Sequence, residues 1–116
     1  MTKATPSMTS YQPGEVLLVS FPLSGGGAPI KRPALVILDT QDADVLLARI
    51  TTQPYTTLHD VAISDWSGAG LLAPSTVRLH KLATLEKNLI RRSLGALQIA
   101  DRAAVANVLH KVYGTW

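Results

Sequence analysis

The apolar residues of this chain fall into short runs, each bounded by proline, glycine or aspartate. Val16–Phe21, Pro33–Leu38 and Val45–Ile50 are runs rich in valine, leucine and isoleucine. Runs of this length and composition are typical of strands rather than helices. Val16–Phe21 is almost continuously apolar, which predicts a strand buried on both faces. The polar segment Asp39–Asp44 predicts a turn between the second and third strands.

Further strands are predicted in the second half of the chain. Ser75–Lys81 alternates between apolar and polar residues, which indicates a half-buried strand. Shorter strands are predicted at Val61–Ile63 and around Ser93. The polar segment Gln53–Asp60 contains a proline and predicts a loop.

The C-terminal segment has a helical pattern instead. Val105, Val108, Leu109 and Val112 recur at helical spacing, and Gly114 follows as a stop signal. Asp101 is the residue that we expect to cap the N-terminus of this helix. Several short strands and one terminal helix predict a mostly β fold, a small curled antiparallel sheet or barrel covered on one side by the helix.

Length and composition limit the classes of protein that this chain can be. At 116 residues it fits one domain, which we place at residues 14–116 after a flexible tail at residues 1–13. It has no cysteine, and its three histidines lack the spacing of metal ligands. No apolar run approaches the roughly 20 residues of a membrane span, and no signal-peptide core is present. We therefore expect a cytoplasmic protein without a membrane partner.

Polar side chains stand at the ends of two predicted strands. Lys31 and Arg32 come directly before the second strand, and Thr51, Thr52 and Gln53 directly after the third. Residues at strand ends are exposed yet held by a rigid scaffold, which suits a functional site. The glycine-rich segment Leu23–Lys31 between the first two strands predicts a mobile loop and lacks the sequence of a phosphate-binding P-loop.

These segments resemble the MazF/PemK family of toxins. The resemblance is carried by G-E-V-x-x-V-x-F-P from Gly14, by R-P-A-x-V-I from Arg32 and by I-T-T-Q from Ile50. Two later blocks, over residues 64–78 and 82–95, follow in the family's order. The resemblance implies an SH3-like barrel that dimerises, like the related CcdB-type toxins. It also implies a toxin of a toxin–antitoxin pair that cuts single-stranded RNA without metal or other cofactor, leaving 2′,3′-cyclic phosphate and 5′-hydroxyl ends.

The resemblance implies roles for two residues. Arg32 matches the family's catalytic arginine, an acid/base and electrostatic clamp, and Thr51 matches the residue that stabilises the transition state. A planar guanidinium can bind two phosphate oxygens at once, whereas its very high pKa makes it a poor base, so the stabilising role is favoured. The alternative is that Arg32 forms a surface ion pair with Glu15 or Asp39 and that Thr51 only ends a strand.

Other residues are candidates for binding RNA. Gln53 can donate to and accept from a base edge, and Tyr55 is the best candidate for stacking on a base. The basic stretch from Arg78 to Arg92 could form a groove for the RNA backbone, or an ordinary solvated face. The predicted RNA-binding residues are Lys31, Thr52, Gln53, Tyr55, Arg78 and Lys81, and the basic stretch adds Lys87, Arg91 and Arg92.

Two other functions are compatible with this sequence. The same fold hosts a toxin that poisons DNA gyrase without chemistry, for which Tyr113 and Trp116 would lie at the binding surface. A catalytically silent barrel that only binds nucleic acid is the third reading. The chain also has no acidic residue in the loop before Arg32, where family members often carry one.

Overall fold

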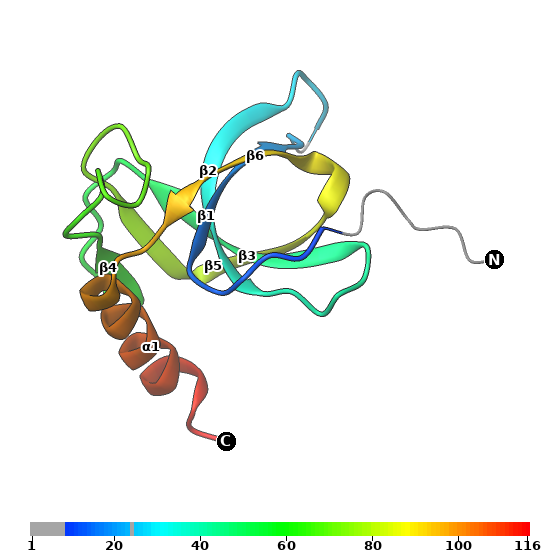
Figure 1. Cartoon of the computed structure of the whole chain (residues 1–116). Coiled ribbons are helices and arrows are strands. Elements are labelled where there is room, and N and C mark those ends of the chain that lie inside the picture. The colour runs from blue at the N-terminus through cyan, green and yellow to red at the C-terminus, as the bar shows by residue number, and fades with distance from the viewer. Residues whose placement is uncertain (1–8, 24) are drawn as a thin grey trace.

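A computed structural model describes residues 9–23 and 25–116 of the chain (Figure 1). Six strands and a C-terminal helix follow one another, with a short 3-10 helix before the last strand. This is the mostly β architecture predicted from the sequence. The elements are β1 (Glu15–Phe21), β2 (Ile30–Leu38), β3 (Asp44–Thr51), β4 (Asp60–Ala62), β5 (Thr76–Glu86), η1 (Lys87–Leu89), β6 (Ile90–Ala96) and α1 (Ile99–Tyr113).

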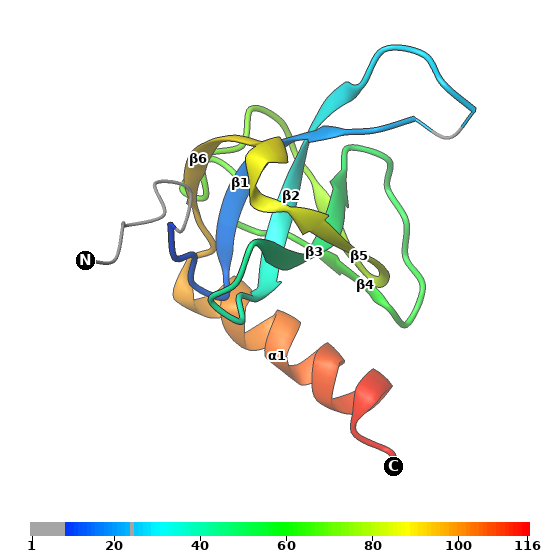
Figure 2. The same cartoon turned by 90° about the vertical axis from the view of Figure 1, so that its right-hand side faces the viewer.

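The strands form one antiparallel sheet in the order β4-β5-β3-β2-β1-β6. The sheet curls strongly, as Figures 1 and 2 show, but over the described residues its edge strands β4 and β6 do not pair with each other. The fold is therefore a curled open sheet rather than a closed barrel. β5 extends beyond the predicted end at Lys81, and a bulge in its pairing with β3 at Ala48/Arg49 lets it bend around the curl.

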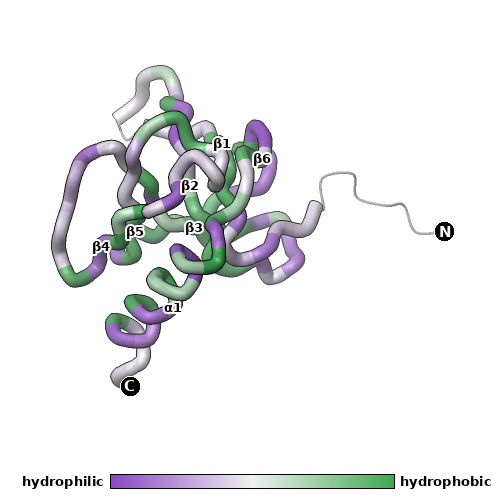
Figure 3. Tube along the Cα trace, turned by 60° about the vertical axis from the view of Figure 1, so that its left-hand side comes forward, coloured by the Kyte–Doolittle hydropathy of each residue, from purple (hydrophilic) through white to green (hydrophobic). Residues whose placement is uncertain are grey.

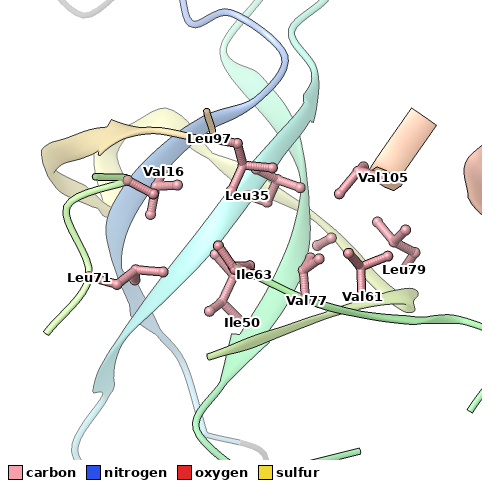
Figure 4. Close-up of a cluster of buried hydrophobic side chains, with 12 residues drawn as sticks. Val16, Leu35, Ile50, Val61, Ile63, Leu71, Val77, Leu79, Leu97 and Val105 are labelled. Carbon is pink, nitrogen blue, oxygen red and sulfur yellow. The ribbon is translucent and has the colours of Figure 1, made fainter. Parts of the chain in front are cut away.

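Both faces of the curled sheet are buried. On one face Val16, Leu35, Ile50 and Val77 pack with the loop after β4 and with α1 (Figure 4). On the other face a second cluster includes Leu17 and joins neighbouring side chains of β1, β2 and β3. Adjacent residues of β1 thus serve different cores, which confirms the prediction that this strand is buried on both faces. The central strands are correspondingly hydrophobic in Figure 3, while α1 alternates between hydrophobic and hydrophilic residues.

The helix begins earlier than predicted. Gln98 is the residue before its first turn, so the prediction of Asp101 as the cap is wrong. Asp101 is buried, and its carboxylate accepts hydrogen bonds from the backbone N–H groups of Ser64 and Asp65, both at 2.9 Å. The carboxylate binds the loop after β4 instead of its own helix. Val105 is buried against the core as predicted.

A buried carboxylate organises the turn between β2 and β3. Asp39 accepts hydrogen bonds from the N–H groups of Tyr11 and Gln41, both at 2.8 Å, and pairs with Lys87 Nζ at 3.0 Å. Burial would raise the pKa of Asp39, but these hydrogen bonds and the ammonium outweigh it and lower the pKa. Lys87 is 3% exposed at its side chain, so its assignment to a basic surface groove is wrong. Tyr11 also packs on the second core, so the folded unit extends into the predicted tail, whose residues 1–8 lie outside the described residues.

The loop after β4 approaches β6 closely. Gly70 has φ +90°, and a Cβ there would collide with the carbonyl group of Leu94. Glycine is therefore required at this contact both for conformation and for space. Within the part of the chain that the structure describes, no helix has the length and apolarity needed to cross a membrane.

Candidate functional site

Arg32 and Thr51 lie at the same end of the β2–β3 ladder. The pair of that ladder nearest this end joins Ala34 to Arg49. Arg32 and Thr51 each lie two residues beyond that pair, so the alternation of side chains places both on one face, across from each other. Two segments separated by the turn between β2 and β3 are thereby brought side by side.

A cavity of about 280 Å³ lies at this end of the ladder. It contains the predicted residues from both strand ends and adds Ser75 and Arg49, which were not predicted. Pro33 and Ile50 also line it. The predicted residues that line it are Lys31, Arg32, Thr51, Thr52 and Gln53.

A tight turn fixes the residues that follow β3. The Thr51 hydroxyl oxygen accepts a hydrogen bond from the Gln53 N–H at 3.1 Å, and the Gln53 carbonyl accepts one from the Tyr55 N–H at 3.0 Å. The Thr51 hydroxyl keeps its own proton free for donation to a ligand. The exposed Gln53 side chain can supply a donor and an acceptor at the rim.

A second cavity of about 230 Å³ adjoins the first and is mostly apolar. Phe21, Leu23 and Ile30 line it together with Arg32 and Arg49, so the two guanidinium-bearing residues line both cavities. The sequence carried a signal for Arg49, because a single charge interrupts the otherwise apolar segment of β3. The side chain is exposed although its neighbours Ala48 and Ile50 are buried.

The other predicted RNA-binding residues lie outside this cavity. Arg78 Nε donates to Asp60 at 2.8 Å, and the guanidinium carbon lies 3.5 Å from the centre of the Tyr55 ring. One face of the Tyr55 ring is thus covered by Arg78, and the ring remains 42% exposed. Lys81 is exposed on the bulged part of β5.

Two histidines lie near Arg78. The rings of His59 and His80, distant in the sequence, approach to 4.7 Å between centroids. Desolvation, followed by the electrostatic effect of the neighbouring Arg78, lowers the pKa of His80 below its usual value. In the described ranges no group of three or more His, Cys, Asp or Glu side chains could hold a metal ion.

The ion pairs considered for Arg32 do not form between described residues. Glu15 accepts hydrogen bonds from Gln12 N–H and the Ser93 hydroxyl, and Asp39 is bound to Lys87. Arg32 is exposed and faces the cavity without a carboxylate partner in residues 9–23 and 25–116. Its charge is therefore available to an anionic ligand.

Comparison with known families decides what kind of protein carries this site. The model of PemK-like and MazF-like toxins of type II toxin–antitoxin systems matches residues 12–113. The chain belongs to this family. The matched range contains both strand ends of the cavity, so the expected family membership is confirmed. Among proteins with curated functions, none matches the sequence significantly.

Solved structures share the fold of this family member. An endoribonuclease from a mycobacterial species is 22% identical with a TM-score of 0.72, covering 94% of this chain and 97% of its own. A mycobacterial endoribonuclease in complex with its cognate antitoxin is 24% identical with a TM-score of 0.71, covering 92% and 98%. A MazE–MazF complex from Deinococcus radiodurans is 17% identical with a TM-score of 0.72, covering 91% and 98%. At these identities the likeness shows the fold.

Proposed function

We propose that this PemK/MazF-family chain is a metal-independent endoribonuclease toxin that cleaves single-stranded RNA. The observation that carries the proposal is the cavity where Lys31 and Arg32 meet Thr51, Thr52 and Gln53. No carboxylate occurs among its described lining residues, so its charge is positive. Such a site attracts a phosphodiester and can hydrogen-bond both its oxygens and a neighbouring base edge.

The cleavage that fits this site uses the RNA's own 2′-hydroxyl. That hydroxyl loses its proton as O2′ bonds to phosphorus, and the bond from phosphorus to O5′ breaks as O5′ takes up a proton. The products are a 2′,3′-cyclic phosphate and a 5′-hydroxyl. Negative charge builds on the non-bridging phosphoryl oxygens, where Arg32 can bind two of them and the Thr51 hydroxyl can donate a further hydrogen bond.

The proposal extends to partners. We infer that the toxin acts as a homodimer in the cytoplasm and that a cognate antitoxin neutralises it, since two of the structural relatives are described in complex with an antitoxin. A groove of about 420 Å³ adjoins the site and shares Pro33, Thr52 and Ser75 with it. Its wall carries Arg92 and the 97% exposed Leu72, so a segment with apolar and acidic residues could bind there and block RNA.

The test is cleavage of a long single-stranded RNA by purified protein in excess EDTA. We expect discrete fragments with cyclic phosphate ends from the wild type, and at least about 100-fold slower cleavage by Arg32→Ala with unchanged thermal unfolding. Lys111→Ala is the charge-matched control, because Lys111 is exposed on α1, at the end of the molecule away from the β1–β2 hairpin (Figure 2).

Two outcomes would contradict the proposal. If Arg32→Ala cleaves RNA at the wild-type rate, Arg32 is not part of the active site. Intact RNA with the wild type would exclude the ribonuclease, and a DNA supercoiling assay with gyrase would then test the non-enzymatic alternative.

A further inference from the structure

A row of directly opposed residues runs across the four neighbouring strands β2, β3, β5 and β4. The net charge of this row is positive. Ala34 of β2 pairs with Arg49 of β3, Arg49 pairs with Arg78 of β5, and Arg78 pairs with Asp60 of β4. The row thus contains two guanidinium groups and a single carboxylate. Like charges placed directly opposite each other on a sheet repel, so Arg49 and Arg78 destabilise each other unless a carboxylate compensates them.

Arg78 takes that carboxylate. Its Nε and Nη2 lie 2.8 and 3.5 Å from the two carboxylate oxygens of Asp60, and the pair is nearly closed to solvent, with side chains 12% and 1% exposed. Arg49 has no ion-pair partner among the residues that the structure describes. Asp60 thus neutralises the charge of Arg78, whereas the charge of Arg49 is not neutralised by a described residue.

Arg49 points its uncompensated charge toward the candidate site. It is two residues from Thr51 on the same strand, and on the ladder it is the diagonal neighbour of Arg32, at a Cβ separation of about 7 Å for such a pair. Both arginines line the polar cavity and the adjoining cavity walled by Phe21, Leu23 and Ile30. Apolar walls lower the local dielectric constant and strengthen the attraction of a guanidinium for an anion.

We propose, on the basis of the proposed function, that Arg49 is a second RNA-backbone ligand that binds the phosphodiester next to the scissile one. Arg32 and Thr51 meet across the open end of the ladder and hold the reacting phosphate. Arg49 lies one step further in, at the boundary with the apolar cavity, and holds the chain in register. It contributes mainly to binding, whereas Arg32 contributes mainly to the chemical step.

The experiment measures binding of an oligoribonucleotide that cannot be cleaved, because each 2′-hydroxyl is methylated, to the full-length protein over a range of salt. Arg49→Ala and Arg49→Gln should weaken binding roughly 10- to 100-fold, and Arg49→Lys should restore part of the affinity. The slope of log affinity against log salt should fall by about 0.7 in the two neutral variants, the value for one lost phosphate contact on a single strand. Lys111→Ala should leave affinity and slope unchanged.

Cleavage kinetics complete the test. With a cleavable RNA, Arg49→Gln should raise KM with kcat changed less than about threefold, while Arg32→Ala lowers kcat. If the wild type cleaves RNA but Arg49→Gln has the same affinity and salt slope as the wild type, the role of Arg49 is wrong and the proposed ribonuclease activity still stands. A wild type that fails to cleave would overturn the proposed function, and the binding arm would still decide whether Arg49 holds a backbone phosphate. If Arg49→Ala unfolds, Arg49→Gln keeps the aliphatic stem and decides the question.

Discussion

Arg78 and Asp60 form a nearly buried ion pair at 2.8 Å, directly opposite each other on β5 and β4. The carboxylate also accepts hydrogen bonds from the hydroxyl and the backbone N–H of Thr57, at 2.6 and 3.0 Å. Arg78 in turn covers one face of Tyr55. The pair therefore ties the short edge strand and the loop that follows the candidate site to the centre of the sheet.

Replacing Asp60 should reduce stability and its dependence on pH. Burial alone would raise the pKa of this carboxyl, but hydrogen bonds from Arg78 and Thr57 lower it from 3.8 to about 2. A lowered native pKa stabilises the fold fully above about pH 4, and this stabilisation is lost as the pH falls toward 2. Asp60→Asn should lower the free energy of unfolding at pH 7 by about 2 kcal/mol, measured by urea denaturation.

The same variant should show a shallower loss of stability between pH 4 and pH 2 than the wild type. Glu86→Gln is the matched control, since Glu86 is exposed and makes no side-chain cap. A wild-type acid slope in Asp60→Asn would show that this pair does not control the pH response.

Removing the Thr51 hydroxyl should slow cleavage without preventing RNA binding. Thr51→Val keeps the shape of the side chain and loses the donor proposed for the phosphoryl oxygen, so kcat should fall by about 100-fold. Thr51→Ser should recover most of the activity, because it also keeps the acceptor for the Gln53 N–H. Equal rates for the valine and serine variants in single-turnover cleavage would exclude a role for the hydroxyl.

Asp101 should be needed for stability rather than activity. Asp101→Ala removes a buried carboxylate and leaves the N–H groups of Ser64 and Asp65 without this acceptor, which should cost about 1–3 kcal/mol of unfolding free energy. Hydrogen exchange should accelerate at these two amides. Asn107→Ala, an exposed change on the same helix, should do neither, and slow exchange at both amides in Asp101→Ala would contradict the assignment.

Substitutions at two glycines should distinguish the cost of backbone strain from the cost of a steric clash. Gly25 and Gly70 have similar φ values of +82° and +90°, but a Cβ at Gly25 meets no atom within 4 Å, whereas one at Gly70 collides with Leu94. Gly25→Ala should cost about 1 kcal/mol and Gly70→Ala about 3 kcal/mol or more, measured by thermal unfolding. Equal costs would mean that the loop moves away from β6 without penalty.

Most of the fold could be predicted from the sequence because its strands are short, apolar and well bounded. β1, β2 and β3 match the predicted runs to within three residues, and the strand ends that carry Arg32 and Thr51 line one cavity. The curl of the sheet was also predicted. The open edge between β4 and β6 was not settled, because it depends on the long-range pairing of two short strands.

The errors concern charged residues whose partners are distant in the sequence. Asp101 resembles a cap locally, but its partners are the backbone N–H groups of Ser64 and Asp65. Lys87 reads as a surface charge until Asp39 is placed beside it. In the sequence Arg49 looks like an ordinary strand residue, and its significance depends on the Asp60 carboxylate being bound to Arg78.

The turn at residues 39–43 acts on the candidate site from the opposite end of the β2–β3 hairpin. Asp39 holds Gln41, which has φ +68°, and so fixes where β3 begins relative to β2. Side chains alternate along a strand, so a slip of one residue would turn Thr51 to the opposite face from Arg32. The length of this turn therefore sets the strand register on which the site depends. An inserted residue that shifted this register would place Arg32 and Thr51 on opposite faces of the sheet.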